Sequence, residues 1–375
     1  MITVKPVRSS RELRRFIKLP WKIYRGDAHW VPPLISEQRR LLARFLPSVD
    51  QKTRCLFLAE SEGRPVGRLA VLIDPALNLV KGSKTGYFSL FESINDADVS
   101  GSLFEATAGW LRRRGMTVLK GPVSPAGPHE DDCKGLLVEG FGRPPVLMTS
   151  YNPPYYQRLM EGQGCIKDFD VHAYLLNKDQ VFAKDPLQLI EYASRRYGFR
   201  LETVDLTKTD REILDIKRVL DLAVPAEWAD MIPPSLEEVR AVTERLRQVA
   251  DPDFVVIARA CDEPIGFAAG LPDYNQVFRH MNGRLTPLGF LKYFYYKRNI
   301  TWLRVFVIFV VPAFRRKGVS HAMYHHLFRR AVAKGYTHAE GSTIGEPNLE
   351  MRRDIESVGG RRYKTYRIYQ KTIGT

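Results

Sequence analysis

Cysteine is scarce in this sequence, and no long apolar run occurs. The four cysteines, Cys55, Cys133, Cys165 and Cys261, lie far apart and form no C-x-x-C pair. We therefore expect neither a disulfide framework nor a cysteine-based metal site, and a reducing cytoplasm is the default compartment. No apolar run approaches the roughly 20 residues that cross a bilayer, and the first residues lack the apolar core of a secretory signal. We expect any membrane contact to be peripheral, at the inner face.

Acidic residues are too few to balance the basic ones. Lys and Arg total 57 against 42 Asp and Glu, which gives a formal charge of +15. Such an excess favours anionic partners: a phosphorylated cofactor, lipid head groups or nucleic acid. The sequence contains no zinc-finger spacing and no basic heptads, and its charges are scattered, so nucleic acid is not an expected partner. The 375 residues predict two or three folded domains.

The most informative stretch is Val305–Ser320, VFVIFVVPAFRRKGVS. Its apolar, mostly β-branched or aromatic start predicts a buried strand, which Pro312 ends. A basic turn follows, and the pattern after it predicts a helix over His321–Lys334. Because a helix N-terminus presents unpaired N–H groups and a partial positive charge, such a turn suits a phosphate. We expect Gly318 to let the backbone approach the ligand and Ser320 to cap the helix.

The spacing of this turn excludes the Walker A and dinucleotide-binding loops, which need G-x-x-x-x-G-K-S/T and G-x-G-x-x-G. It resembles the acyl-CoA pyrophosphate loop of the GNAT acyltransferases, Q/R-x-x-G-x-G/A, with Ser320 where the family prefers glycine or alanine. The alternative is a basic surface turn after a core strand. The resemblance implies that acyl-CoA is held by the strand end and the turn: Val310, Val311, Arg315, Arg316, Lys317, Gly318, Val319 and Ser320.

The predicted elements repeat at a period of roughly half the chain, each half with a strand, helices, a hairpin, a strand, a helix and a strand. This order is similar to the GNAT fold. We therefore expect an α/β protein with a mixed sheet and two GNAT copies, divided into residues 1–178 and 179–375. The first copy has the acidic, glycine-free turn Ile94–Asp98 where the second has its basic loop. We expect the N-terminal copy to be degenerate and to form part of the acceptor or acyl site.

Longer stretches resemble a bacterial group of two-domain GNAT proteins. This resemblance covers nearly the whole chain. They include YRGDAHWVPPL, GLLVEGF, YNPPYY, LPDYNQ and EPNLEMRRDIESVGGRRYKTYRIYQK. Bacterial ceramide synthases, which acylate a long-chain base from acyl-CoA, belong to or near this group. The resemblance implies N-acyl transfer from acyl-CoA to a primary amine, with a lipid-like amine favoured. A small polar or protein amine is an alternative acceptor, and a non-catalytic acyl-CoA-binding or membrane-docking module is an alternative of another class.

An N-acyl transfer needs a base for the amine and an acid for the leaving thiolate. The strand Val305–Val311 has no carboxylate, so the base must lie elsewhere. Glu340, in the neighbouring predicted strand, is the first candidate, since an ionisable group in a central strand needs a reason; the alternative is an ion pair with an arginine. Asp273, at the end of the third strand of the copy, is the second candidate, and a turn-forming role is its alternative.

Candidates for the acid are Tyr363 and Tyr366 on the last predicted strand, and Ser342. The two tyrosines lie on opposite faces under a period of 2 unless a bulge offsets them. Asn348 precedes the last helix, where it suits an N-cap, and the GNAT resemblance implies a contact with the pantetheine arm.

No metal is expected. His321 and His325 have helical i, i+4 spacing but no third ligand in the sequence nearby, so we interpret them as solvated. The insertion segment Leu288–Arg298 mixes aromatics with cations. This composition predicts either an interfacial helix that meets anionic lipid or a helix that covers the domain interface.

Overall fold

The computed structural model describes residues 1–46, 52–181, 186–205, 208–226, 228, 231–247 and 249–374. The chain packs into two compact units. Unit 1 comprises Met1–Val171, Asn275–Arg298 and Lys364–Thr375, and unit 2 comprises His172–Tyr274 and Asn299–Tyr363. Two strands, β7 (Ile166–Asn177) and β13 (Arg361–Thr372), contribute residues to both units. The assignment of one GNAT copy to 1–178 and one to 179–375 stays a prediction.

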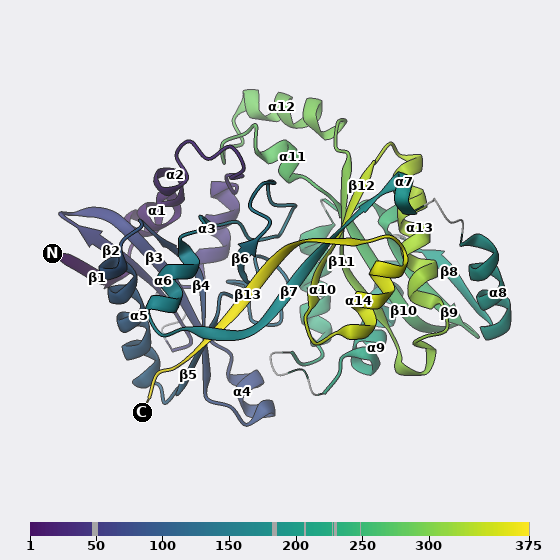
Figure 1. The fold of residues 1–375 in the computed structure, drawn as a ribbon, viewed down its shortest axis with the longest axis horizontal. Helices are drawn as coiled ribbons and strands as arrows, with labels where there is room; N and C mark the ends of the chain where they lie inside the picture. The colour runs from purple at the N-terminus through teal and green to yellow at the C-terminus, as the bar shows by residue number, and fades with distance from the viewer. Residues whose placement is uncertain are drawn as a thin grey trace. The chain divides into compact units, whose positions relative to one another are not determined.

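Unit 1 is built on a mixed sheet (Figure 1), and it has its own apolar core. Its strands follow in the order β1 (Ile2–Pro6), β2 (Arg54–Ser61), β3 (Arg64–Ile73), β4 (Thr85–Ser93), β5 (Val118–Gly121) and the end of β13, which also pairs with β6 (Leu136–Glu139). Its helices are α1 (Ser10–Lys18), α2 (Pro20–Ile23), α3 (Ile35–Ala43), α4 (Pro75–Lys81), α5 (Ala97–Arg112), α6 (Tyr156–Gly162), α11 (Asn275–Phe278) and α12 (Pro287–Lys297).

Unit 2 repeats this plan around a second core. Its strands follow in the order β8 (Phe199–Thr203), β9 (Val255–Ala260), β10 (Glu263–Pro272), β11 (Trp302–Val310) and β12 (His338–Gly345). Its helices are α7 (Lys178–Val181), α8 (Leu187–Tyr197), α9 (Thr209–Ala223), α10 (Leu236–Leu246), α13 (Val319–Ala333) and α14 (Leu349–Ser357), with the 3₁₀ turns η2 (Pro252–Phe254) and η3 (Pro312–Phe314).

The two units share one pattern of strand pairing. In each, three successive pairings are antiparallel and the fourth, β4 with β5 or β11 with β12, is parallel. A parallel pair needs a crossover connection, and α5 and α13 supply it. This shared order confirms the predicted α/β fold with a mixed sheet, and it is the structural counterpart of the repeat in the sequence.

Local sequence signals explain several boundaries. A capping box begins α1, because Ser9 accepts from the Glu12 N–H and Glu12 reaches back to the Ser9 N–H. Glu62 and Gly63, both at positive φ, form the first hairpin turn. The second hairpin turns at Cys261 and Asp262, without glycine. Helices α4 and α8 were not predicted.

The segment Asn275–Arg298, which sequence order assigns to the C-terminal half, packs within unit 1. The Ile35 N–H donates to the Gly283 carbonyl at 3.0 Å, and the Trp21 indole N–H donates to Asn282 Oδ1 at 2.8 Å. These contacts attach the segment to α2 and to the start of α3. Among the described helices, none is long and apolar enough to cross a membrane.

Candidate functional site

Helix α13 begins at the predicted phosphate loop. Gly318 is the residue before the helix, with φ +82°, a left-handed conformation that favours glycine. No side chain of the described residues caps the helix, so its first-turn N–H groups face the loop. The prediction that Ser320 caps α13 is wrong. Ser320 lies inside the first turn, and its hydroxyl donates to Asp354 Oδ2 at 2.6 Å.

The basic residues of the loop have different surroundings. Arg315 is engaged with backbone: its guanidinium donates to the carbonyls of Val310 at 3.3 Å and Ala223 at 2.8 Å, which holds the loop against β11 and α9. The Lys317 ammonium lies over the rings of Tyr197 and Phe314, 5.3 and 4.9 Å from their centroids. Arg316 is exposed. Arg315 therefore shapes the loop, and Arg316 is the cation with most freedom to meet an anion.

The corresponding crossover helix of unit 1 begins differently. Asp96 caps α5, and its carboxylate accepts from the N–H groups of Asp98 at 2.8 Å and Val99 at 3.3 Å. Asp98 adds a second negative charge to the first turn. A carboxylate already satisfies these N–H groups, and two acids repel a further anion. Of the two helix starts, only that of α13 has the character of a phosphate seat.

The parallel strands β11 and β12 are hydrogen-bonded only at their beginnings. Their register runs from Trp302 opposite His338 to Val305 opposite Gly341, whereas β11 continues to Val310 and β12 to Gly345. On its other side β11 stays paired with β10 as far as Val310. The edge of β11 that faces away from β10 therefore has backbone groups beyond Val305 that β12 does not bind, directly before the loop.

Three of the predicted catalytic residues meet in unit 2. The carboxylate of Glu340, in β12, is fully buried and accepts from two hydroxyls. Ser342 donates to Oε1 at 2.5 Å, and Tyr363, on β13, donates to Oε2. Among the described residues, Glu340 forms no ion pair with an arginine, which was the expected alternative.

Arg304 is a residue that the sequence analysis missed. It is fully buried, lies opposite Glu340 in the strand register, and donates to Ser342 Oγ at 2.9 Å and to the Ser342 carbonyl at 3.3 Å. Ser342 thus connects the guanidinium of Arg304 to the carboxylate of Glu340. An arginine within the apolar run WLRVFVIFV was the available signal, and the predicted strand began one residue after it.

The other two catalytic candidates are Asp273 and Tyr366. Asp273 is buried directly after β10, and its N–H donates to the Trp302 carbonyl at 2.9 Å. Tyr366 belongs to unit 1, where it packs against Gly135, and the register of β13 against β6 shifts between Thr365 and Tyr366. The sequence analysis left undecided whether a β-bulge offsets the two tyrosines, and β13 has such a bulge at this position.

Asn348 caps α14, since its Oδ1 accepts from the Met351 N–H at 3.2 Å. Its side-chain NH₂ group donates no hydrogen bond within the described part of the chain, so it can donate one to a ligand. His325 is buried and His321 contacts Ser357 Oγ at 2.7 Å, so neither histidine is simply solvated as interpreted. Among the described residues, no group of His, Cys, Asp and Glu is arranged to hold a metal ion.

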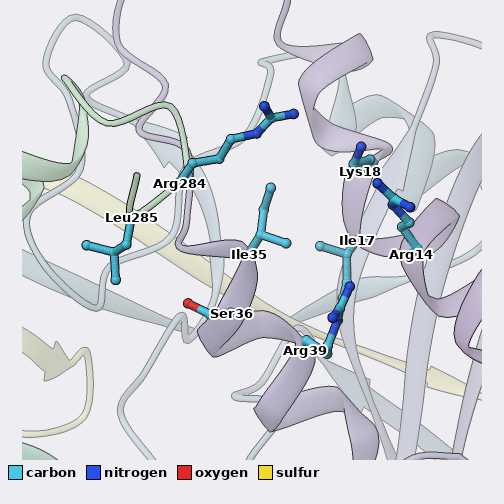
Figure 2. A pocket seen from close by; sticks show the side chains of 9 residues that line it. Arg14, Ile17, Lys18, Ile35, Ser36, Arg39, Arg284 and Leu285 are labelled. Atoms are coloured by element: carbon cyan, nitrogen blue, oxygen red, sulfur yellow. The ribbon is translucent and has the colours of Figure 1, made fainter. Parts of the chain in front are cut away.

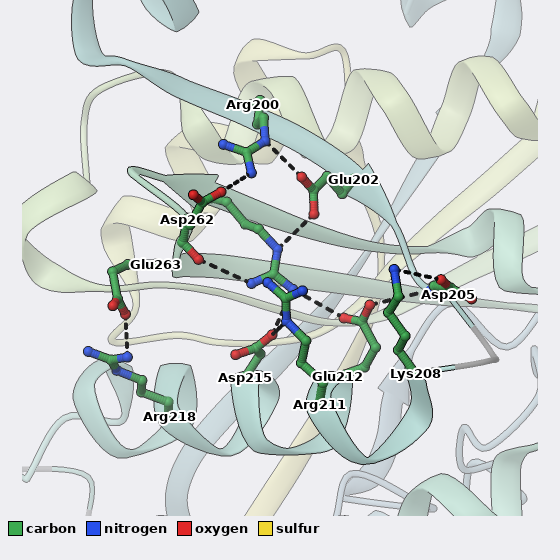
Figure 3. Close-up of polar contacts among 11 residues, drawn as sticks. Arg200, Glu202, Asp205, Lys208, Arg211, Glu212, Asp215, Arg218, Asp262 and Glu263 are labelled. Carbon is green, nitrogen blue, oxygen red and sulfur yellow. Dashed lines mark hydrogen bonds and ion pairs between the residues drawn. The ribbon is translucent and has the colours of Figure 1, made fainter.

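A second charged cluster of unit 2 is structural. The buried Arg259, on β9, donates to Glu202 at 2.8 Å, Asp215 at 2.6 Å and Glu212 at 3.4 Å. Burial alone would lower the pKa of Arg259, but hydrogen bonds to Asp215 and Glu202 outweigh it and the pKa lies above its ordinary value. Figure 3 shows that these carboxylates come from β8 and α9, so the arginine joins them to β9.

Comparisons with known proteins agree with this geometry. Residues 222–359 match the Acetyltransferase (GNAT) family. The bacterial ceramide synthase of Caulobacter vibrioides is 30% identical over 386 aligned positions, which cover 99% of this chain and 98% of that protein.

Two solved structures show the same fold. A tandem GNAT protein from the clavulanic acid biosynthesis pathway superposes with a TM-score of 0.55 at 14% identity and covers 100% of this chain and 99% of its own. A GCN5-related N-acetyltransferase from Sphaerobacter thermophilus gives a TM-score of 0.56 at 12% identity and covers 100% and 96%. The chain therefore belongs to the GNAT family of acyl-CoA-dependent N-acyltransferases, in the two-domain group that includes the bacterial ceramide synthase.

Proposed function

We propose that this enzyme transfers a long acyl chain from acyl-CoA to the primary amine of a long-chain base, which yields a ceramide. The observation that carries the proposal is the 30% identity with the bacterial ceramide synthase of Caulobacter vibrioides across 99% of this chain. The fold alone would allow many amine acceptors, because related folds host different substrates.

The C-terminal loop would hold the CoA moiety. In this proposal the first-turn N–H groups of Val319 and Ser320 bind the pyrophosphate, and the exposed guanidinium of Arg316 neutralises it. The pantetheine arm runs along β11 from Val310 and Val311, where β11 does not pair with β12. It then meets the side-chain NH₂ group of Asn348. Arg315 and Lys317 keep the loop in shape.

The chemistry would depend on Glu340 and Tyr363. The ammonium form of the amine gives one proton to the Tyr363 oxygen as the tyrosine proton passes to Glu340, and the neutral nitrogen then attacks the thioester carbonyl carbon. As the tetrahedral intermediate collapses, the C–S bond breaks and the amide forms. The second proton of the attacking nitrogen passes to the sulfur, which leaves as the free thiol. The hydrogen bond from Tyr363 to Glu340 supports this path. Asp273 is the second candidate for the base, and Ser342 and Tyr366 are further candidates for the acid.

A lipid acceptor suggests contact with a membrane surface. Helix α12 exposes Leu291, Phe294 and Tyr295, at 69%, 52% and 67% of their surface, beside Lys292 and Lys297. Apolar side chains flanked by cations suit the head-group zone of an anionic bilayer. We propose peripheral binding through this face. Phe294→Ser with Tyr295→Ser should reduce co-flotation with anionic vesicles and leave CoA binding intact.

Release of free CoA thiol tests the reaction. Acetyl, medium-chain and long-chain acyl-CoA are each offered with sphinganine, a polyamine or an amino acid. Turnover restricted to a long chain and sphinganine supports ceramide synthesis. Preference for acetyl-CoA and a polar amine would refute the lipid acceptor and leave the phosphate seat standing.

A further inference from the structure

A second basic site lies in unit 1, outside the acyl-transfer machinery. It is a pocket of about 400 Å³ between α1, the start of α3 and the segment before α12 (Figure 2). Four cations line it: Arg14 and Lys18 from α1, Arg39 from α3, and Arg284. We call it the cationic pocket. Its volume lies within the roughly 300–1,000 Å³ that small-molecule sites occupy.

The cations of the cationic pocket have no acidic partner among the residues that the structure describes. Within the described part of the chain, no carboxylate lies within 4.0 Å of Arg14, Lys18, Arg39 or Arg284. Their sequence neighbours differ, because Arg15 forms an ion pair with Glu60 and Arg40 forms one with Glu37. The unpaired set is therefore a property of the pocket and not of α1 and α3 as a whole.

Gathering these cations has an energetic consequence. Like charges around one hollow repel one another, and water and salt screen part of this repulsion because Arg14, Arg39 and Arg284 are exposed. No acidic side chain among the described residues relieves this repulsion. A bound anion would relieve it, so the pocket suits a negatively charged ligand.

The helix α3 adds to the positive potential. Ile35 and Ser36, in its first turn, line the pocket, and no described side chain caps the helix, whose preceding residue is Leu34. The Ile35 N–H is bound by Gly283, so the following N–H groups and the Ser36 hydroxyl remain as donors. The one acid of this turn, Glu37, is neutralised by Arg40 at 2.5 Å.

The rest of the lining is apolar. Ile17 and Ile35 lie between the cations in Figure 2, and Leu285 stands at another side of the pocket. Guanidinium groups bind phosphate oxygens in a fork, with two parallel hydrogen bonds. Three arginines, a lysine, a helix start and an apolar floor therefore suit a phosphate that carries an organic group better than a bare inorganic ion.

We propose that the cationic pocket binds the phosphate group of a small organic phosphate, either a free glycerol-phosphate-like molecule or the head group of an anionic phospholipid. The two sources present the same chemistry to the arginines. Bound lipid would lie near the exposed face of α12, which begins at Pro287, just after Arg284 and Leu285. The site is additional to the acyl-CoA loop and does not depend on the proposed acceptor.

The test measures binding of the full chain without acyl-CoA or amine. One arm titrates sn-glycerol 3-phosphate and inorganic phosphate by calorimetry, and the other sediments phosphatidylcholine vesicles with and without phosphatidate. The pocket variant is Arg14→Glu with Arg39→Glu. The control is Arg11→Glu with Arg113→Glu, which makes the same charge change at exposed residues of unit 1 outside the pocket. Arg284→Ala is a second pocket variant that keeps α1 and α3 unchanged.

We expect both pocket variants to bind the phosphate about tenfold or more weakly while the control binds like the parent protein, since each pocket variant removes charge-assisted hydrogen bonds to the phosphate. Affinity for glycerol 3-phosphate would identify the free molecule as the ligand, and affinity for phosphatidate vesicles alone would identify the lipid. Equal losses in the pocket variants and the control, or binding of neither probe by the parent protein, would overturn the proposal. Acyl transfer is measured separately, so either idea can fail alone.

Discussion

The hydroxyl of Tyr363 donates a hydrogen bond to the buried carboxylate of Glu340. Ser342 donates to the other oxygen of that carboxylate, and Arg304 donates to Ser342. A carboxylate that accepts from a tyrosine can receive that proton when the tyrosine takes one from a substrate. The arrangement makes Glu340 and Tyr363 a testable proton path.

Glu340→Gln should lower kcat/KM by about 10²–10⁴ without loss of CoA affinity, because the amide keeps the shape but accepts no proton. Tyr363→Phe should have a similar effect if the proton passes through its hydroxyl. The double variant should then be little worse than either single variant, as expected for residues that act as a unit. Thiol release in steady state measures all three.

Additive losses in that cycle would show that Glu340 and Tyr363 act independently. Full activity of Glu340→Gln would rule out Glu340 as the base and leave Asp273 as the candidate. Asp273→Asn is therefore assayed together with the Glu340 and Tyr363 variants. Asp273 is the remaining carboxylate candidate because it is buried directly after β10.

Arg316→Glu should reduce CoA affinity by at least about tenfold, since it replaces an exposed cation beside the start of α13 with an anion that repels the pyrophosphate. Arg329→Glu makes the same charge change at an exposed residue of the same helix, away from the loop. Calorimetric titration with CoA compares them. If both variants bind like the parent protein, the loop is not the phosphate seat.

The loop was predictable because its signals are local. An apolar strand, a proline, a glycine and a helix follow one another within Val305–Lys334, and the structure places a strand, a glycine at positive φ and a helix there. The parallel pairing of β11 with β12 follows from the crossover through α13. Neighbouring residues therefore carry most of the information about this half of the site.

Features that depend on long-range packing were not predictable. The hydrogen bond from the Ile35 N–H to the Gly283 carbonyl joins residues that are far apart in sequence, so no local pattern indicates it. The partners of Ser320 and Arg315 are likewise distant, at Asp354 and Ala223. A side chain that suits a cap by type can bond elsewhere when a nearby helix offers a stronger acceptor.

Removing Arg259 should destabilise unit 2 strongly. Arg259→Met leaves the carboxylates of Glu212 and Asp215 without their buried partner, and such a loss costs about 3–5 kcal/mol of unfolding free energy. Arg200→Met removes an exposed arginine from the same cluster and should have a much smaller effect, because water screens its ion pairs. Urea unfolding followed by fluorescence measures both. Equal effects would show that burial of Arg259 is unimportant.

Acid should weaken unit 1 through Asp170. Burial raises the pKa of this carboxyl, but hydrogen bonds from Arg367 at 2.8 and 3.1 Å and from Lys167 outweigh it, so its pKa is below the ordinary value. The stabilisation is present above the unfolded pKa of about 3.9 and is lost as pH falls through the lower folded pKa. Asp170→Asn should therefore be less stable than the parent protein at pH 7, and the difference should shrink below about pH 4. A constant difference at all pH values would contradict the assignment.

Because Asp96 caps α5, its removal should affect the stability of α5 without affecting CoA binding at α13. Asp96→Ala should lower the unfolding free energy by about 1 kcal/mol, because the N–H groups of Asp98 and Val99 lose their acceptor. Asp98→Ala, which removes an exposed acid of the same turn that makes no cap, should have a smaller effect. In the parent protein and in both variants, CoA should bind with one site per chain and unchanged affinity, since the seat lies at α13. A second CoA that also binds the Arg14→Glu, Arg39→Glu variant of the cationic pocket would show that α5 accepts an anion and that the N-terminal copy is not degenerate.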